Sequence, residues 1–298
     1  MKTIPEYLAQ LRIALAGADP ALMQDALYDA EEYLRSELAE HPEMTEAEVI
    51  AAVAGSYGAP EEVAAIYLDT EVKVQTALRA PPPPPRDSLP GRFFGVAADP
   101  RTYGAMFYSI LALATGIFYF TWVVTGISLS LGFSLIIIGV PFVILFLGSV
   151  RLLSLVEGRI VEVMLGERMP RRPVYADRDR PVLTRIGEMF TDPRTWSTLL
   201  YMLAMLPLGI FYFATTVVLL ATSLALVVAP PLALFGAFDG WTLSGGWYGY
   251  WEPSTTLGVW ELPVAFACGV VLLFATLHLL RGIGRVHGAI AKQLLVKA

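Results

Sequence analysis

The sequence predicts an all-α membrane protein, with a small soluble helical bundle ahead of a polytopic bundle of four transmembrane helices built from two repeated helical hairpins. Three observations predict this fold. Of the 298 residues, 55% are apolar and only 16% are charged, whereas soluble domains carry about a quarter charged residues. Two long intervals lack basic residues, and one short motif recurs at a fixed offset.

The charge is divided unevenly along the chain. Residues 1–79 hold 5 Lys/Arg and 15 Asp/Glu, a net charge of −10, whereas the remainder holds 16 basic and 12 acidic residues, a net of +4. Nucleic-acid binding needs clustered Lys/Arg, so we expect no nucleic-acid partner for the acidic domain, which suits a basic protein partner better. The N-terminus has no apolar core followed by a cleavage site, so we expect the first membrane helix to direct insertion.

Residues 1–79 are expected to form an acidic cytoplasmic domain of four short helices. Leucines and isoleucines recur at helical spacing from Ile4 to Leu15. Asp19-Pro20 is typical of a helix N-terminus, and Thr45-Glu46-Ala47-Glu48 is a capping box that predicts a third helix ending near Ser56. Gly58-Ala59-Pro60-Glu61-Glu62 predicts a turn and the start of the fourth helix.

This domain resembles the HAAS-type module, a small helical domain found ahead of membrane regions in bacterial regulatory proteins. Three segments carry the resemblance: Tyr7-Leu8-x-x-Leu11, Asp29-Ala30-Glu31-Glu32-Tyr33-Leu34, and Tyr57-Gly58-Ala59-Pro60-Glu61-Glu62-Val63-Ala64. The family usually has a His after the glutamates of the second segment, where this chain has Tyr33. The other interpretation of these residues is a generic solvated helical bundle.

A proline-rich linker and two hydrophobic intervals follow. Five consecutive prolines from Pro81 to Pro85 predict a stiff spacer within a linker at 80–92; a proline-recognition site is the less favoured alternative. No charged residue occurs from Thr102 to Val150, and no Lys or Arg from Thr195 to Leu280. Since a span needs about 20 apolar residues, the sequence predicts four spans, at about 104–127, 131–153, 197–228 and 260–281.

Two boundaries are expected within these spans. A short turn near Ser128–Gly132 separates the first two, and the third helix either tilts or ends early at Pro230-Pro231. The membrane domain at 93–298 then divides into one repeat at 93–172 and another at 186–298.

The two repeats are indicated by matches at one offset of 93 residues. Asp99-Pro100-Arg101-Thr102-Tyr103 recurs as Asp192-Pro193-Arg194-Thr195-Trp196, and Tyr108 matches Tyr201. The segment 116–120, Gly-Ile-Phe-Tyr-Phe, recurs at 209–213. Asp99 and Asp192 can cap helices, Pro100 and Pro193 suit the first helical position, and Arg101 and Arg194 can reach phosphates or acidic side chains. Tyr103 and Trp196 suit interface depth. A cap with a membrane anchor is favoured over a ligand site at the repeat junction.

The distribution of basic residues predicts the orientation. All 21 Lys/Arg fall in 1–101, 151–194 and 281–298, so the positive-inside rule places both termini and the loop 151–194 in the cytoplasm. The start of that loop is expected to be an interfacial helix or an extension of the second span.

The membrane region resembles a sensor domain found in bacterial histidine kinases and related membrane proteins. The resemblance covers about residues 93–298 and rests on the Asp-Pro-x-Thr-aromatic entry, the stretch 207–213, Ile138-Gly139-Val140-Pro141, and the exit at 157–166. It implies a signal-sensing or regulatory module without a defined ligand. No kinase catalytic domain follows in this sequence, so output is expected through the N-terminal domain or a partner.

No catalytic constellation is visible, and no cofactor or metal site is expected. His41, His278 and His287 are expected in a turn, near the last span's end, and in the tail, without the spacing of metal ligands. Cys268 is the single cysteine, so no disulfide can form within the chain. The spans are expected to lack the acids and bases that mark proton relays.

The segment 236–261 is expected on the outer side and has no counterpart in the first hairpin. It holds four of the six tryptophans. An aromatic belt on the membrane surface is the favoured interpretation. The alternative is a binding surface for a lipid, an amphiphile or a partner, formed by Trp241, Trp247, Tyr248, Tyr250 and Trp251.

The sequence therefore favours a non-enzymatic sensory or regulatory protein of the bacterial inner membrane. It would relay an envelope or amphiphile signal to a cytoplasmic regulator. The alternative is an accessory subunit of a membrane complex such as an ABC-type transporter. Membrane lipids are expected partners, and a homo-oligomer is compatible with the small residues in the spans.

Overall fold

The computed structural model describes residues 2–78, 88–133, 139–172, 187, 190–235, 242–244, 254–256 and 260–296. The chain divides into two compact units. One unit comprises Met1–Pro82, Ile117–Met205 and Val286–Ala298, and the other comprises Pro83–Gly116 and Leu206–Arg285. Helices α6, α9 and α10 each contribute residues to both units.

The N-terminal domain contains the four predicted helices. They are α1 (Ile4–Ala14), α2 (Pro20–Glu40), α3 (Glu46–Ser56) and α4 (Pro60–Leu78). Their N-termini are capped as the local sequence requires: the Asp19 carboxylate accepts the Ala21 N–H at 2.9 Å, and Thr45 and Glu48 form a complete capping box. Gly58 adopts a φ of 116°, which allows the tight turn into α4.

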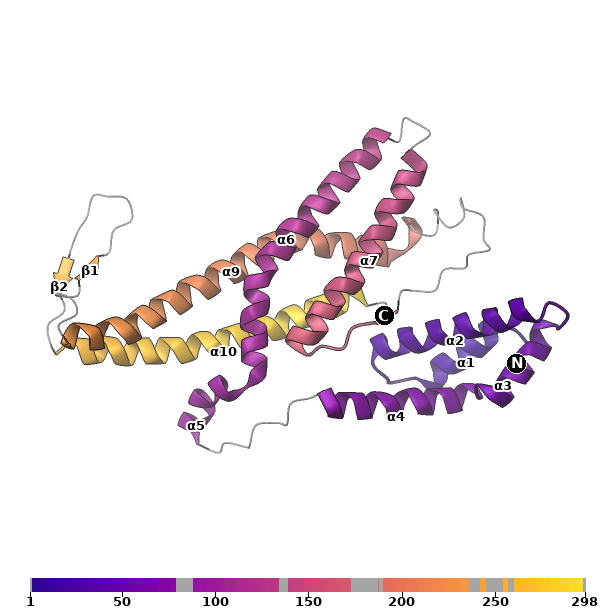
Figure 1. Cartoon of the computed structure of the whole chain (residues 1–298), viewed down its shortest axis with the longest axis horizontal. Helices are drawn as coiled ribbons and strands as arrows, with labels where there is room; N and C mark the ends of the chain where they lie inside the picture. The colour runs from indigo at the N-terminus through magenta and orange to yellow at the C-terminus, as the bar shows by residue number, and fades with distance from the viewer. Residues whose placement is uncertain are drawn as a thin grey trace. The chain divides into compact units, whose positions relative to one another are not determined.

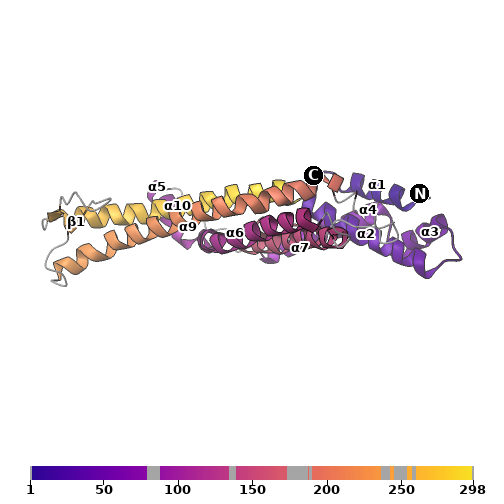
Figure 2. The same ribbon diagram turned by 90° about the horizontal axis from the view of Figure 1, so that it is seen from above.

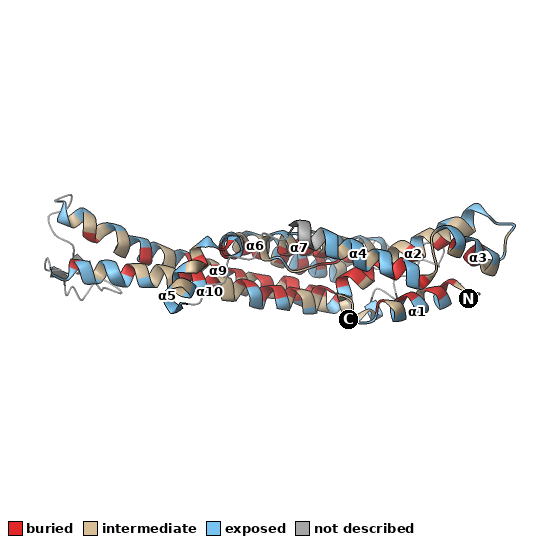
Figure 3. Ribbon diagram, turned by 90° about the horizontal axis from the view of Figure 1, so that it is seen from below, coloured by how far each residue is buried: buried red, intermediate tan, exposed pale blue. Residues whose placement is uncertain are grey.

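One apolar core holds these helices together. Its members lie on the inward stripe of each helix, where Figure 3 shows buried positions. Full burial of a valine, leucine or isoleucine side chain contributes about 1.5–3 kcal/mol to stability. The core residues are Ile4, Tyr7, Leu11, Leu15, Ala26, Ala30, Leu34, Val49, Ile50, Val53, Val63 and Ala64.

Four helices are long and apolar enough to cross a membrane within the described part of the chain: α6 (Pro100–Phe133), α7 (Gly139–Leu165), α9 (Pro193–Leu234) and α10 (Leu262–Leu295). The predicted all-α fold with four membrane helices is therefore confirmed. The helices are longer than the predicted spans. A helix of 34 residues is about 51 Å long, whereas the hydrocarbon core is about 30 Å thick, so these helices must continue beyond the lipid.

One predicted boundary was wrong, and one of two alternatives for another is excluded. The turn expected near Ser128–Gly132 is helical, because α6 runs on to Phe133. Pro230 and Pro231 do not end α9, which continues to Leu234. In lipid, a broken helix would leave backbone N–H and C=O groups without hydrogen-bond partners. This cost outweighs the tendency of glycine and proline to end a helix.

In the first unit, α6 and α7 pack as a hairpin and lie side by side in Figures 1 and 2. Trp122 of α6 donates its indole N–H to Ser149 of α7 at 2.9 Å. The ring of Phe146 lies against Gly126, where an added Cβ would be only 2.0 Å from it. The α6 glycine is therefore needed for the close approach of the two helices.

In the second unit, α9 and α10 lie side by side (Figure 2). A Cβ added to Gly269 of α10 would lie 2.6 Å from the side chain of Leu226 on α9. The short helices α5 (Leu89–Phe94) and η1 (Gly95–Ala98) precede α6. Phe93 of α5 stacks on His278 of α10 with ring centroids 5.5 Å apart, and its carbonyl oxygen lies 3.0 Å from His278 Nε2.

Two short strands follow α9. Strand β1 (Thr242–Ser244) pairs antiparallel with β2 (Ser254–Thr256), with Leu243 opposite Thr255. The sequence did not predict this hairpin.

Candidate functional site

The chain leaves α7 through a left-handed glycine and enters a basic segment. Gly166 has a φ of 76°, and its N–H donates to the Glu162 carbonyl at 3.1 Å, which is an αL helix end. The next residues, Glu167-Arg168-Met169-Pro170-Arg171-Arg172, are described and lie against the N-terminal domain.

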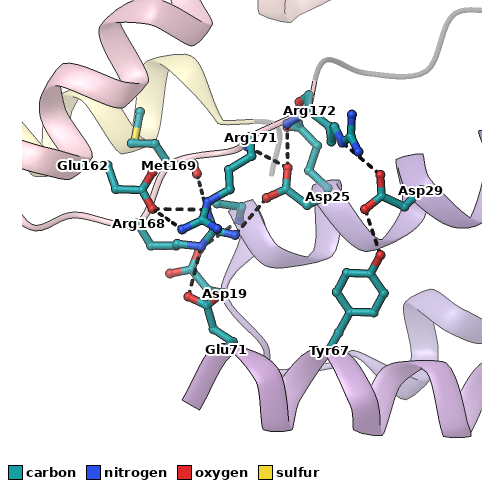
Figure 4. A network of polar contacts seen from close by, with 12 residues as sticks. Asp19, Asp25, Asp29, Tyr67, Glu71, Glu162, Arg168, Met169, Arg171 and Arg172 are labelled. Carbon is teal, nitrogen blue, oxygen red and sulfur yellow. Dashed lines mark hydrogen bonds and ion pairs between the residues drawn. The ribbon is translucent and has the colours of Figure 1, made fainter. Parts of the chain in front are cut away.

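Arg168 joins this segment to two helices of the N-terminal domain (Figure 4). Its guanidinium pairs with Asp25 of α2 at 2.9 Å, Glu71 of α4 at 3.0 Å and Glu162 of α7 at 3.4 Å. It also donates to the Met169 carbonyl at 2.6 Å. We call Arg168 and these three carboxylates the Arg168 clamp. A guanidinium has five N–H donors in one plane, so a single arginine can bind several oxygen atoms at once.

The clamp is largely shielded from water. The Arg168 side chain is 9% exposed, and those of Asp25 and Glu71 are 7% and 12% exposed. Without the guanidinium, Asp25 and Glu71 would lose their shared cation in a poorly hydrated site, whereas Glu162 would keep its ion pairs with Arg159 and Arg171. The clamp is therefore a specific junction that needs all its members, since an unpaired buried charge is costly.

Asp25 is the centre of the contacts on α2. Its Oδ1 accepts the backbone N–H of Arg171 at 2.7 Å and of Arg172 at 2.8 Å. Burial raises the pKa of Asp25 above its ordinary value, and these hydrogen bonds and Arg168 offset only part of that effect. The neighbouring Gln24 donates to the Arg172 carbonyl at 2.7 Å.

A second ion pair lies along α2. Arg172 pairs with Asp29 at 3.0 Å and lies 5.7 Å from the ring centroid of Tyr28. Asp29 also accepts the hydroxyl of Tyr67 of α4 at 2.9 Å. Burial and this carboxylate raise the pKa of Tyr67, so its hydroxyl remains a donor at neutral pH.

The ends of two membrane helices also contact the N-terminal domain. Arg194, near the start of α9, donates to Gln24 Oε1 at 2.9 Å. Lys292, near the end of α10, pairs with Asp19 at 2.5 Å. Among the described residues, the acidic domain thus contacts basic residues of the same chain, in residues 168–172, Arg194 and Lys292.

A second polar cluster lies within the first unit, which we call the Glu157 cluster. Glu157 of α7 accepts hydroxyl hydrogen bonds from Tyr119 of α6 at 3.0 Å and Tyr201 of α9 at 2.9 Å. The Tyr201 oxygen lies 3.0 Å from Nε2 of His287 on α10. Glu157 and His287 are fully buried.

Glu157 and His287 of this cluster both lie in helices. Glu157 was expected in an interfacial helix or an extension of the second span, and α7 does continue through it to Leu165. His287, expected in the tail, lies in α10. The burial of the two side chains in one cluster was not predicted. The missed signal was helical periodicity: buried positions recur along α7 at Val150, Ser154, Glu157 and Val161.

The two Asp-Pro-Arg motifs make equivalent contacts. Asp99 Oδ1 accepts the Arg101 N–H, and Asp192 Oδ1 accepts the Arg194 N–H, each at 3.1 Å. Both prolines are the first residues of helices α6 and α9. Tyr103 donates to the Ala97 carbonyl at 2.7 Å, and Trp196 donates to the Phe190 carbonyl at 2.8 Å.

Each motif aspartate also pairs with an arginine of a membrane helix. Asp192 pairs with Arg151 of α7 at 3.2 Å in the first unit. Asp99 pairs with Arg281 of α10 at 2.9 Å in the second unit. A small pocket beside Arg151, Asp192 and Arg194 is lined by Ser154 and Thr198. The motif aspartates thus combine a cap with an ion pair.

Five residues make up the aromatic surface that the sequence predicts. Trp241, Trp247, Tyr248, Tyr250 and Trp251 lie outside the described residues. Trp260, which precedes α10, is 91% exposed. Among the described residues, no group of three His, Cys, Asp or Glu could hold a metal ion.

A comparison with protein families supports the sensor resemblance. Residues 108–295 match the model of the Sensor family, described as "Putative sensor". The chain belongs to this family. The searches of curated proteins and of solved structures gave no match. The matched range includes Glu157, Arg168, Arg172 and Arg194, whereas Asp25 lies in the preceding domain.

Proposed function

We propose that this protein is a sensory or regulatory protein of the bacterial inner membrane, with both termini in the cytoplasm. Its N-terminal domain, which we assign to the HAAS type, would relay the state of the sensor domain to a cytoplasmic regulator. The observation that carries the proposal is the Arg168 clamp, because it joins the residues directly after α7 to α2 and α4.

The clamp offers a physical route from membrane to cytoplasmic domain. A displacement of α7 moves Glu162 and, through the turn at Gly166, moves Arg168. The buried carboxylates of the clamp are stable only while the Arg168 guanidinium pairs with them. Two states of the N-terminal domain follow, one docked through Asp25 and one released, and a signal acts by changing their populations.

The proposed signal is an envelope condition or an amphiphile recognised by the aromatic segment at 236–261, or a change in the lipids around the helices. No catalytic step is assigned to the protein. Its output is the surface of the N-terminal domain that docking covers, which includes Asp25, Asp29 and Gln24. Release would present these acidic groups to a basic regulator.

Affinity purification from native membranes in mild detergent tests this assignment. The wild type and Arg168→Ala would be compared, with bound proteins identified by mass spectrometry. We expect a cytoplasmic regulator that is enriched by Arg168→Ala, since release uncovers α2. Deletion of the chromosomal gene should change envelope-stress transcription, and unchanged transcription would refute a signalling role.

The alternative is an accessory subunit of a membrane complex such as a transporter. One observation favours it: an apolar groove runs along α9 and α10 in the second unit. It is lined by Leu226, Pro263, Val264, Ala267, Val271 and Ala275. Recovery of a stoichiometric integral membrane partner, equal for the wild type and Arg168→Ala, would favour this alternative.

Protease accessibility in oriented membrane vesicles tests the orientation. The proline-rich linker at 80–92 and the segment 173–186 should be cleaved from the cytoplasmic face only. The segment 245–253 should be cleaved from the opposite face only. Cleavage of all three from one face would contradict the proposed topology.

A further inference from the structure

The Glu157 cluster forms a continuous hydrogen-bonded chain across four helices. His287 of α10 contacts Tyr201 of α9 at 3.0 Å, Tyr201 contacts Glu157 of α7 at 2.9 Å, and Tyr119 of α6 contacts the other carboxylate oxygen at 3.0 Å. The exposed fractions are 0% for Glu157 and His287, 1% for Tyr201 and 2% for Tyr119. The proposed clamp mechanism does not use these groups.

The direction of the hydrogen bonds can be assigned from their chemistry. Tyr201 has a single hydroxyl hydrogen, which it donates to Glu157. Its oxygen must then accept the third contact, so Nε2 of His287 carries a hydrogen. The protonation of the other ring nitrogen, Nδ1, decides whether His287 is charged.

Charge balance restricts the protonation states of the buried pair. A buried carboxylate beside a neutral imidazole carries a net charge of −1, which burial penalises. Two arrangements with one further proton are neutral: ionised Glu157 with a His287 imidazolium, and protonated Glu157 with neutral His287. Interacting groups of this kind titrate as a pair.

We propose that the Glu157 cluster is a binding site for one proton, which Glu157 and His287 share through Tyr201. In the transfer, the Nε2–H bond of His287 breaks and its proton binds the Tyr201 oxygen. The Tyr201 hydroxyl proton passes at the same time to Glu157 Oε1. Tyr201 is neutral before and after, and His287 becomes the Nδ1–H tautomer. Loss of the shared proton to water leaves a net charge of −1.

Other charged groups on the surrounding elements either contact other residues or are exposed. Arg159 of α7 pairs with Glu162, and Arg285 of α10 is exposed. No charged residue occurs between 117 and 133 of α6. The remaining cations of α7, α9 and α10 contact other groups; these contacts are Arg151–Asp192, Arg194–Gln24, Arg281–Asp99 and Lys292–Asp19. Buried tyrosines Tyr108 and Tyr212 lie on α6 and α9.

Two glycines beside the cluster lie close to the residues that flank Arg168 in the chain. Gly158 follows Glu157, and an added Cβ there would lie 3.3 Å from Met169. Gly288 follows His287, and an added Cβ there would lie 2.6 Å from Glu167 Cγ. Arg168 stands between these two contact residues in the chain. A shift of α7 or α10 caused by the buried charge therefore moves the clamp, so that proton loss releases the N-terminal domain.

This coupling rests on the proposed function, whereas proton binding does not, so the test has two readouts on the full chain in lipid nanodiscs. The first is infrared difference spectroscopy between about pH 5 and about pH 9. We expect a protonated-carboxyl band that Glu157→Gln abolishes and that Glu32→Gln, the same change on the exposed face of α2, leaves intact. His287→Gln should shift the pH at which this band is lost. If Glu157→Gln leaves the spectrum unchanged, the proton site is refuted, whatever the clamp does.

The second readout is hydrogen exchange of residues 20–30 and 166–172, corrected for the intrinsic pH dependence. In the wild type, protection should fall as the pH rises and the proton is lost. Glu157→Gln imitates the protonated carboxyl and should keep this protection at higher pH. Asp25 also titrates, but it is present in both the wild type and Glu157→Gln. The difference in hydrogen exchange between these two proteins therefore reports on Glu157 alone. A normal infrared band with equal exchange in both proteins would overturn the coupling alone.

Discussion

Arg168 and Asp25 are 143 residues apart in the chain and form an ion pair of 2.9 Å between side chains that are only 9% and 7% exposed. An ion pair between residues so far apart in the chain, and so well covered, holds the N-terminal domain against the segment after α7 within the first unit. Most surface ion pairs contribute about 0–1 kcal/mol, whereas removal of one partner from a covered pair is far more costly. This difference makes Arg168 the most informative residue to change.

Arg168→Ala should release the N-terminal domain while leaving both parts folded. The change leaves Asp25, Glu71 and Glu162 without their shared cation, at a cost of about 3 kcal/mol to docking. Hydrogen exchange in residues 20–30 and 166–172 should increase more than tenfold, since about 1.4 kcal/mol corresponds to a factor of ten. Arg168→Lys should show an intermediate effect, because an ammonium group cannot present the same fork of donors.

Arg159→Ala is the matched control for this change. Arg159 is on the same stretch of chain and pairs with Glu162, but its side chain is 49% exposed. Its removal should alter exchange only slightly. Equal exchange in Arg168→Ala and Arg159→Ala would show that the clamp does not hold the domain.

The two motif aspartates allow capping to be separated from ion pairing. Asp99→Asn and Asp192→Asn retain a side-chain acceptor for the helix N-terminus but lose the charge that faces Arg281 or Arg151. Asp99→Asn should lower the thermal midpoint in nanodiscs more, since the Asp99 side chain is 6% exposed and that of Asp192 is 21% exposed. Substitution by Ala should cost about 1 kcal/mol more at each site, through loss of the cap. Identical midpoints for the Asn and Ala variants would exclude a capping role.

The sequence was sufficient for features that depend on local chemistry. Asp19-Pro20 and the Thr45–Glu48 capping box determine helix N-termini by contacts within four residues, so these could be predicted. The four membrane helices were predicted because long apolar intervals have few other stable environments. The caps formed by Asp99 and Asp192 could be predicted for the same reason, because each aspartate accepts the N–H of a residue only two positions away.

The clamp and the Glu157 cluster could not be predicted in the same way. A charged residue such as Arg168 has the same sequence signature whether it is solvated or paired with a carboxylate 143 residues away. An extension of the second span through Glu157 was expected, and α7 does continue to Leu165, but the burial of Glu157 was not predicted. The register of buried positions would have revealed Glu157, but only if it had been followed past the last purely apolar turn.

The N-terminal core contains a tyrosine that should make the domain sensitive to alkaline pH. Tyr7 is fully buried, donates to the Gly58 carbonyl at 2.8 Å, and has a pKa raised by burial to about 12. Because the folded pKa lies above the unfolded value of about 10, the stabilisation is complete below about pH 10 and is lost as the pH rises through 12. The core residues all lie within positions 4–64, so the fragment 1–79 is expected to fold.

Tyr7→Phe in this fragment should reduce the alkaline loss of stability. It should also lower stability at neutral pH by about 1 kcal/mol, through loss of the hydrogen bond. Urea unfolding followed by circular dichroism at several pH values measures both effects. Thr3→Ala, which removes the cap of the same helix, should lower stability equally at every pH. A Tyr7→Phe curve parallel to the wild type would contradict the assignment.

Gly209 should be intolerant of any side chain. In the second unit, a Cβ at this position would lie 2.2 Å from the backbone oxygen of Ala112 and 3.1 Å from Leu113 Cα, so α6 and α9 are in direct backbone contact. Helix backbones cannot yield as a flexible side chain can, and Gly209→Ala should separate the helices at a cost of about 1–3 kcal/mol.

Gly148→Ala is the matched control, because an added Cβ there has no neighbour within 4 Å. In that helix the change should be neutral or stabilise by about 0.5–1 kcal/mol, since alanine loses less conformational entropy than glycine. Thermal unfolding in nanodiscs should therefore give opposite or clearly unequal shifts for the two alanine variants. Equal shifts would show that the backbone contact at Ala112 does not limit the packing of α6 against α9, and that glycine is present at position 209 for another reason.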